Sequence, residues 1–149
     1  MNINSNDVNI FVNVLGFLNS KVSQYLLKMI NPTLNTTVNT VLSLPYEKLY
    51  FEQNIGNKVN ENINISKIDW DCFETSWDFE KHPIIEFKSN NIENSFKNWS
   101  DFAEKQFNQL KSNEEELNRI FIDIYGLQDE LTPEVEDKDI TIRKADRDR

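Results

Sequence analysis

Cysteine, histidine and glycine are scarce in this chain of 149 residues, which holds one, one and three of them. With Cys72 alone, no disulfide can form within the chain and no zinc cluster can be assembled. The three glycines, Gly16, Gly56 and Gly126, stand far apart, so there is no glycine-rich loop of the kind that binds a nucleotide or S-adenosylmethionine. We therefore expect no catalytic, cofactor-binding or metal-binding residue in this chain.

Long apolar runs and a basic leader are also missing. The first apolar stretch, from Val8 to Leu18, is interrupted by two asparagines and is too short to cross a bilayer. The residues before it carry none of the positive charge of a secretory signal. Together with the single cysteine, these features predict a cytoplasmic protein that makes no contact with a membrane.

Basic side chains are outnumbered in the second half of the chain. Residues 66–149 carry 12 basic and 21 acidic side chains, which gives the whole net charge of −9, whereas residues 1–65 are neutral. Because an acidic surface repels phosphate, contact with DNA is expected from the first half rather than from the second. The same charge also fits another class of protein, an acidic helical interaction module that mimics DNA.

Hydrophobic spacing predicts a mainly α fold with a small β part, that is, an α+β class. Apolar side chains at intervals of three and four predict a long N-terminal helix over about residues 8–30, which Pro32 stops. A run rich in Thr, Val and Leu predicts a short strand at residues 38–44. A weak helical pattern follows over residues 47–65, and Ser66 is predicted to cap a separate short helix.

The second half is predicted to form a helical arm built on one long helix over about residues 95–125. Gly126 suits the end of that helix, while "SNEE" from Ser112 has the pattern of a helix cap and allows a break there. The segment "DITIR" from Asp139 is a strand candidate without an evident partner. Four aromatic residues are expected to pack in the core against the long helix: Trp70, Phe73, Trp77 and Phe79.

The pair Asn31-Pro32 resembles the start of the Asn-Pro-Pro-aromatic motif with which amino-methyltransferases hold a flipped-out adenine. In that motif the asparagine and a proline carbonyl accept hydrogen bonds from the adenine, and the aromatic ring stacks on it. Here Thr33 and Leu34 stand where the second proline and the aromatic residue would be. We therefore interpret the pair as the end of a helix and the start of a turn.

A second short match lies at Glu86 and Lys88, which follow two isoleucines. In restriction-type nucleases a Glu-x-Lys half-site helps to hold a metal ion and assists the attacking water. Asp78 or Asp71 would have to supply the further carboxylate. Because matches of this length arise by chance in a highly charged chain, an exposed linker is the simpler interpretation.

Three longer segments resemble known families. "LGFLNSKVSQYLLKMINPTLNTTVNTVLSLPY" resembles the closing part of a target-recognition domain, as found in type I specificity subunits and large adenine methyltransferases. "SKIDWDCFETSWDFEKHPII" and "FNQLKSNEEELNRIFIDIYGLQDELTPEVEDKDITIRKAD" resemble the PglX family of adenine-specific DNA methyltransferases of BREX phage-resistance systems, with their type II restriction-modification relatives. The resemblance extends from about Asn9 over nearly the whole chain.

This resemblance implies that the chain is a non-catalytic piece of a much larger enzyme, whose S-adenosylmethionine and catalytic motifs lie before this region. Residues 1–46 would be the end of a target-recognition-like domain, and residues 47–149 a helical spacer or arm that is truncated at its C-terminus. The chain would help to recognise or position DNA, with other defence-system subunits as further partners. The candidates for contact with DNA are the polar residues after the first helix, Asn31, Thr33, Asn35, Thr36 and Thr37.

Overall fold

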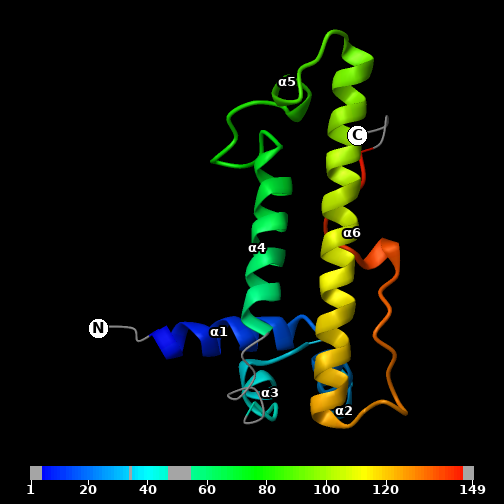
Figure 1. The fold of residues 1–149 in the computed structure, drawn as a ribbon. Coiled ribbons are helices and arrows are strands. Elements are labelled where there is room, and N and C mark those ends of the chain that lie inside the picture. Colours follow the sequence, from blue (N-terminus) through cyan, green and yellow to red (C-terminus); the bar gives the residue numbers. More distant parts are fainter. Residues whose placement is uncertain (1–4, 34, 47–54, 146–149) are drawn as a thin grey trace. The chain divides into compact units, whose positions relative to one another are not determined.

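The computed structural model describes residues 5–33, 35–46 and 55–145, and every regular element in these ranges is helical (Figure 1). The elements are α1 (Ser5–Leu18), α2 (Lys21–Ile30), α3 (Val38–Leu42), α4 (Ile55–Asp71), α5 (Pro83–Glu86), α6 (Ile92–Tyr125) and the 3-10 helix η2 (Asp137–Asp139). Because these ranges contain no strand, the predicted α+β class is wrong and the fold is helical.

Two compact units divide the chain. Unit 1 consists of Met1–Asn60 and Asn113–Glu134, and unit 2 of Glu61–Ser112 and Val135–Arg149. Helices α4 and α6 contribute residues to both units, so neither unit is one continuous segment. The boundary expected after residue 46 separates a recognition domain from a helical arm by function rather than by contacts, and it stays a prediction.

The long N-terminal helix is interrupted at Ser20, which separates α1 from α2. The Ser20 hydroxyl accepts a hydrogen bond from the Ser23 N–H at 3.3 Å and donates to the Phe17 carbonyl at 2.7 Å. The Ser23 hydroxyl in turn donates to the Leu18 carbonyl at 2.8 Å. Both serines are buried with their hydrogen bonds made, so the cap stabilises the start of α2 at the break.

The interruption changes which apolar side chains are buried. Phe17 and Val22 lie fully in the core, whereas Phe11 and Met29 are mostly exposed. The predicted single helix over residues 8–30 is therefore wrong, and the apolar positions that a continuous helix would align on one face are divided between α1 and α2. The predicted end of this segment is confirmed, since α2 ends at Ile30.

The segment predicted as a strand forms helix α3. Thr37 is its N-cap, and the Thr37 hydroxyl accepts a hydrogen bond from the Thr40 N–H at 3.3 Å. The two threonine hydroxyls also share a hydrogen bond of 2.9 Å. A capping threonine satisfies a backbone donor of the first turn, and here this local bond outweighs the weak preference of Thr and Val for strands.

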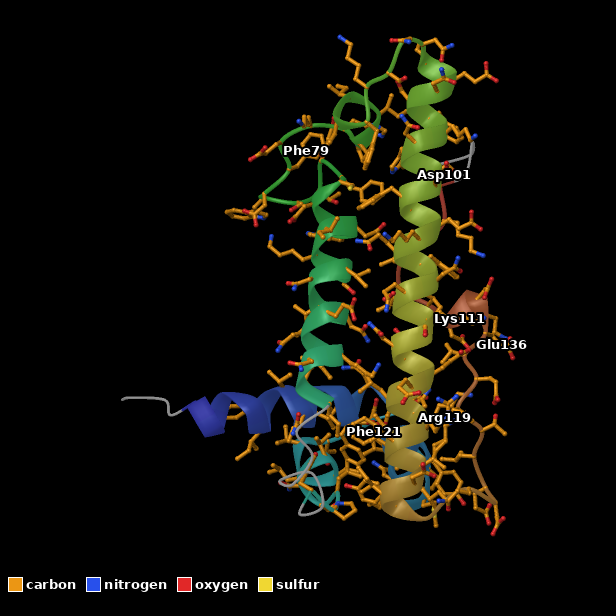
Figure 2. All side chains as sticks on the ribbon, in the orientation of Figure 1. Phe79, Asp101, Lys111, Arg119, Phe121 and Glu136 are labelled. Atoms are coloured by element: carbon orange, nitrogen blue, oxygen red, sulfur yellow. The ribbon has the colours of Figure 1, made fainter. Side chains whose placement is uncertain are left out.

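Phe17 lies at the centre of the core of unit 1. Its ring packs edge-on against that of Phe121, which Figure 2 labels on α6, with the centroids 5.6 Å apart. It also stacks on Tyr125 with the centroids 5.2 Å apart. Next to it, Gly16 allows a close approach to α4, because a Cβ atom at this position would lie 2.5 Å from Val59 Cγ2. The buried members of the cluster are Phe17, Val22, Leu44, Ile55, Val59, Leu117, Phe121 and Ile122.

Helices α4 and α6 each continue through a residue at which the sequence suggested the start of a new helix. Residues 47–54, the first part of the helical pattern predicted over 47–65, lie outside the described residues. Ser66 lies inside α4, so the separate helix that it was predicted to cap does not exist. Ser112 lies inside α6, which runs without a break from Ile92 to Tyr125. The predicted long helix is thus confirmed, and Gly126 follows it with a φ of +69°, the left-handed conformation expected of a glycine at a helix end.

The core of unit 2 forms where the tail of the chain packs on α6. Ile140 and Ile142 are buried and cluster with Phe107 and Leu110 of α6. Asp139 belongs to the 3-10 helix η2 and the residues after it form no strand, so the strand predicted for "DITIR" is wrong. None of the helices in the described ranges is long and apolar enough to cross a membrane.

Asp137 holds the tail to α6 by charge. It pairs with Lys111 of α6 at 2.7 Å and with Lys144 at 3.3 Å. Hydrogen bonds from these two ammonium groups, Lys111 first, lower the pKa of the Asp137 carboxyl. The Lys144 ammonium also lies 4.6 Å from the centre of the Phe107 ring. The charged and the apolar contacts of the tail are therefore both made with residues 107–111 of α6.

Candidate functional site

The polar residues expected to contact DNA lie together in the loop between α2 and α3. Asn31 ends α2 and is half-buried, Thr37 begins α3, and the other three residues are exposed between them. Residues 8–46 contain two lysines, Lys21 and Lys28, and no acid, so the local charge does not oppose a phosphate backbone. The geometry brings the candidates to one loop, and their contact with DNA stays a prediction.

The Asn31 side chain is engaged in the turn that follows α2. Its Nδ2 donates to the Asn35 carbonyl at 2.9 Å. Its Oδ1 accepts from the Thr33 N–H at 3.1 Å and from the Thr33 hydroxyl at 2.6 Å. An asparagine that bonds to the backbone two residues further on forms an Asx turn, which is the role expected at the end of a helix rather than in the clamp of an adenine.

The carboxylates considered for a nuclease metal site are paired with a lysine. Lys67 on α4 lies 2.6 Å from Asp71 and 2.6 Å from Asp78. Glu86 is an exposed residue at the end of α5, and Lys88 is exposed after it. Among the described residues no group of three or more His, Cys, Asp or Glu is arranged to hold a metal ion. The ion pairs therefore oppose a nuclease site that would use these two aspartates.

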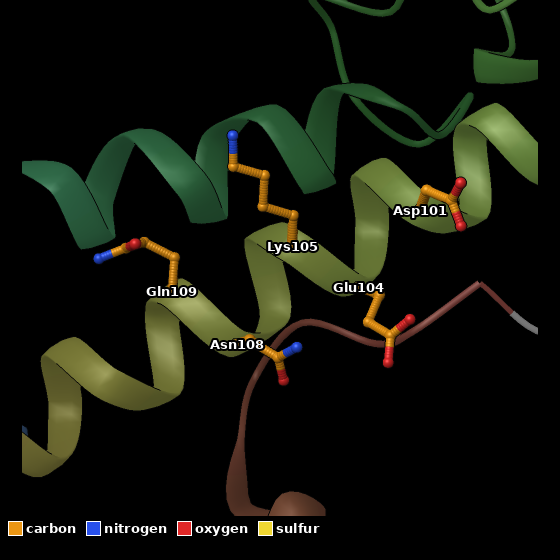
Figure 3. Close-up of a pocket in the computed structure, with 5 residues that line it drawn as sticks. All are labelled: Asp101, Glu104, Lys105, Asn108 and Gln109. Atoms are coloured by element: carbon orange, nitrogen blue, oxygen red, sulfur yellow. The ribbon is translucent and has the colours of Figure 1, made fainter.

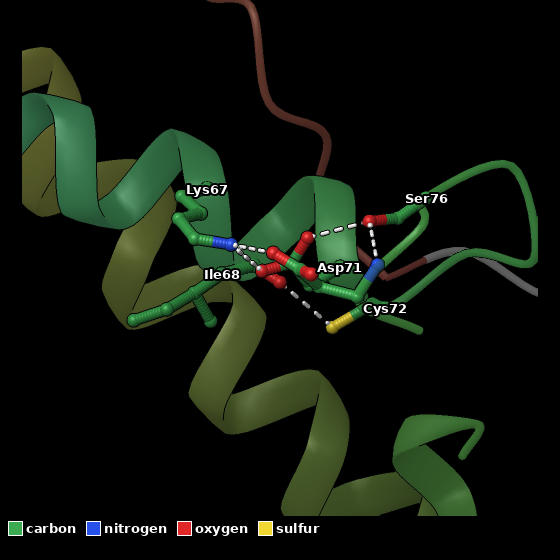
Figure 4. A network of polar contacts seen from close by, with 6 residues as sticks. Lys67, Ile68, Asp71, Cys72 and Ser76 are labelled. Carbon is green, nitrogen blue, oxygen red and sulfur yellow. Dashed lines mark hydrogen bonds and ion pairs between the residues drawn. The ribbon is translucent and has the colours of Figure 1, made fainter. Parts of the chain in front are cut away.

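The polar contacts after α4 form a closed network, which we call the Lys67 network and define as Lys67, Asp71, Ser76 and Asp78 (Figure 4). The Ser76 hydroxyl donates to Asp71 Oδ1 at 2.6 Å and accepts from the Asp78 N–H at 3.1 Å. Hydrogen bonds from Lys67 and then from Ser76 lower the pKa of Asp71. The hydrogen bonds that Lys67 donates to Asp71 and Asp78 raise the pKa of Lys67. The network ties the segment after α4 back to the last turns of that helix.

The aromatic residues in this segment are not all in the core. The Trp77 side chain is 101% exposed and Trp70 is 57% exposed, whereas Phe73 and Phe79 are half-buried. The prediction that all four pack against the long helix is therefore wrong for both tryptophans. One part of the Lys67 network could be predicted from the sequence, because Lys67 and Asp71 are four residues apart on one helix.

An open hollow of about 500 Å³ lies along α6 (Figure 3). It is lined by Asp101, Glu104, Lys105, Asn108 and Gln109. A small-molecule site is usually a concave pocket with mainly apolar walls and a few polar groups. Because every lining residue here is polar or charged and the hollow is open, it has the character of a solvated helix face.

Comparison with known proteins points to one family. The chain is 42% identical over 150 residues to the adenine-specific methyltransferase PglX of Lacticaseibacillus casei (strain Zhang), a match that covers 97% of the chain and 12% of that protein. It is 36% identical over 129 residues to the adenine-specific methyltransferase BrxX of Escherichia coli O9:H4 (strain HS), covering 87% of the chain and 10% of that protein. The resemblance to the PglX family is confirmed. No family model and no solved structure matches the chain.

The PglX match concerns one segment of a long protein. The chain spans about a tenth of the length of each of these two relatives. Identity of this degree over 97% of the chain relates the chain to that segment of PglX and not to the activity of the whole relative.

Proposed function

We propose that this chain is a non-catalytic segment of a PglX-type adenine-specific DNA methyltransferase from a BREX or restriction-modification defence system, where it helps to recognise or position DNA. The observation that carries the proposal is the 42% identity over 97% of the chain to a segment of a methyltransferase. S-adenosylmethionine would then be bound by other parts of the parent enzyme. That enzyme would act on DNA in the cytoplasm beside other subunits of the defence system.

The loop between α2 and α3 is the surface that we propose contacts DNA. Asn31 and Thr33 shape this loop through their mutual hydrogen bonds, and Thr37 caps α3. This leaves the exposed Asn35 and Thr36 side chains as the groups offered to the duplex. Asparagine and threonine often bind phosphate oxygens, which fix the position of a protein on DNA without reading the sequence.

The test is a chimera in which this chain replaces the matched segment of the L. casei relative. We expect the chimera to methylate adenine in cellular DNA, whereas the relative without the segment should not, and methylation-sensitive sequencing would measure both. Two results would contradict the proposal. One is an inactive chimera that accumulates normally and still binds S-adenosylmethionine, and the other is full activity of the relative without the segment.

A matched pair of variants in the chimera tests the loop. Replacing Asn35 and Thr36 by alanine should lower methylation and weaken binding to duplex DNA, while binding of S-adenosylmethionine is unchanged. Asn39→Ala changes an exposed asparagine of α3 outside the loop and should leave all three measurements as they were. Equal activity of the two variants would remove the loop from the proposed DNA surface.

The acidic excess of residues 66–149 favours a second candidate, an acidic helical interaction module that binds proteins by mimicking DNA. The exposed acids of α6, such as Asp101 and Glu104, would form part of its surface. Affinity capture with the complete chain separates the two candidates. Recovery of methyltransferase and defence-system subunits supports the first, and recovery of unrelated nucleic-acid enzymes supports the second.

A further inference from the structure

Trp77 places an indole ring in water on the surface of unit 2. It follows the buried Ser76 and lies inside the turn that the Phe79 N–H closes with a hydrogen bond of 3.4 Å to the Ser76 carbonyl. On α4, the exposed Ile63 and Trp70 belong to one row of the helix, with Lys67 between them at spacings of four and three. Tryptophan is enriched among residues that dominate the binding energy of protein interfaces, so this exposure calls for an explanation.

The backbone around Trp77 is fixed on both sides of the residue. The preceding Ser76 is bonded to Asp71 at 2.6 Å and to the Asp78 N–H at 3.1 Å. The following Asp78 is held by Lys67 at 2.6 Å. None of these contacts uses the indole, so the turn is formed before anything binds it. The backbone of the turn is therefore already ordered, so binding does not have to order it.

The charge around Trp77 indicates the chemistry of its partner. Residues 67–81 carry five acids and two lysines, so the segment keeps a net charge of −3 although Lys67 is paired with Asp71 and Asp78. This rim repels the phosphates of DNA, and it would equally repel the same rim of a second copy of the chain. A protein surface with arginine or lysine side chains around an apolar pocket would instead be attracted by the acids and could bury the indole.

We propose that residues 72–80, with Trp77 as the anchor, dock into a basic-rimmed apolar pocket on another part of the PglX-type methyltransferase. This inference rests on the proposed function, because the partner surface would belong to the remaining part of a parent that is about eight times as long as the chain, which spans 12% of the L. casei relative. Lys67 acts as a positioning residue, since it holds Asp78 next to the anchor without touching the partner.

The test mixes the complete chain with the L. casei relative from which the matched segment has been deleted. Isothermal titration calorimetry should show binding that weakens as salt rises, because the rim is electrostatic. Trp77→Ala should weaken this binding by at least about tenfold, as expected for a tryptophan hot spot. The melting temperature of this variant alone should equal that of the wild type, because the indole makes no packing contribution where it is fully exposed.

Two further variants sharpen the test. Ile92→Ala removes an apolar side chain of unit 2 that is 79% exposed on α6, and it should bind like the wild type. Lys67→Met keeps the tryptophan but releases Asp78, so it should weaken binding by a smaller factor than Trp77→Ala. Blue-shifted fluorescence on mixing, present with the wild type and lost in Trp77→Phe, would report burial of this indole.

The proposal is overturned if Trp77→Ala binds as tightly as the wild type, or if the wild-type chain does not bind the deleted relative at all. Trp77-dependent binding to duplex DNA, or Trp77-dependent dimers of the chain, would overturn it as well. The methylation assay separates this inference from the proposed function. A chimera that methylates equally with Trp77→Ala refutes the docking surface alone, whereas an inactive chimera beside Trp77-dependent binding refutes only the role in methylation.

Discussion

The side chain of Asn118 on α6 accepts a hydrogen bond at 3.0 Å from the backbone N–H of Lys21, which lies 97 residues earlier in the chain. The same amide donates to the Pro133 carbonyl at 3.2 Å. Asn118 is buried, so one side chain satisfies backbone groups from two distant segments of unit 1. Its amide joins the start of α2, the second half of α6 and the segment that leaves α6.

We predict that Asn118→Ala lowers the free energy of unfolding by about 2 kcal/mol, because it leaves part-buried backbone groups without partners. Urea denaturation of the complete chain measures this change. Asn108→Ala is the matched control, because Asn108 is an exposed asparagine of the same helix, and its effect should stay within about 0.5 kcal/mol. Equal stability of the two variants would show that the Asn118 contacts contribute nothing.

Two glycines with opposite surroundings give a second prediction. Gly16→Ala places its Cβ 2.5 Å from Val59 Cγ2, and the stiff, branched valine cannot swing away, so overpacking should destabilise the chain by about 1–3 kcal/mol. Gly56→Ala meets only Asn13 Oδ1 at 3.7 Å and should stabilise α4 by up to about 1 kcal/mol. Thermal melts decide the matter, and changes of the same sign at the two positions would contradict it.

Glu114 should make the stability of the chain depend on pH. Burial raises its pKa to about 7, from 4.5 in the unfolded chain. The folded state therefore binds the proton more tightly, so stability falls as the pH rises from about 4.5 through 7 and then levels off.

Glu114→Gln is neutral at every pH and removes this loss. We expect it to raise the free energy of unfolding by about 1–2 kcal/mol at pH 8, a figure reduced for solvent screening of a partly buried group, and to change it little at pH 4. Chemical denaturation at the two pH values measures the difference. Glu104→Gln, on the exposed face of α6, is the control, and a Glu114→Gln effect that is the same at both pH values would refute the assignment.

The tail of unit 2 allows the apolar and the ionic contacts to be compared. Ile142→Ala should destabilise the chain by about 2–4 kcal/mol, because it empties a buried site beside Phe107 and Leu110. Asp137→Asn removes only ion pairs in which the aspartate is exposed, and its effect on unfolding should be small. Limited proteolysis of the tail would reveal either loss, and a larger effect of Asp137→Asn would reverse this ranking.

The elements that sequence reasoning found are those set by local chemistry. Pro32 forces the end of α2 at Ile30 through its ring and its missing N–H, whatever surrounds it. The apolar stripe of α6 recurs at helical spacing over many turns, and Gly126 ends it with a conformation that suits glycine. Such signals need no knowledge of the rest of the fold.

The misses arise where distant contacts or a single cap decide the outcome. Ser20 looks like an ordinary polar residue in an apolar stretch, and only the hydrogen bonds of its hydroxyl show why the helix is interrupted there. The strand predicted at 38–44 is wrong because the helix cap at Thr37 outweighs the strand propensity of the threonines and valines. Whether Trp77 is buried depends on a turn fixed by Lys67, eleven residues away from Asp78, which no periodicity reveals.

The candidate site was predictable only in part. The residues after Pro32 do form one exposed polar loop, because a proline stop followed by small polar residues leaves the chain at the surface. The Asn31 side chain bonds to Thr33 and Asn35 only because the turn brings these residues within reach. The position of the loop could therefore be predicted from the sequence. Only the structure shows that Asn31 and Thr33 form hydrogen bonds within the loop while the Asn35 and Thr36 side chains are exposed.

The grip of two carboxylates on Lys67 also affects its chemical reactivity. Its side chain is 56% accessible, yet both aspartates hold its ammonium at 2.6 Å and keep it protonated. Only the neutral amine can attack an acylating reagent, so Lys67 should be labelled more slowly than its accessibility alone suggests. In a mass-spectrometric labelling experiment, slow acylation of Lys67 would serve as a built-in reporter of the intact turn.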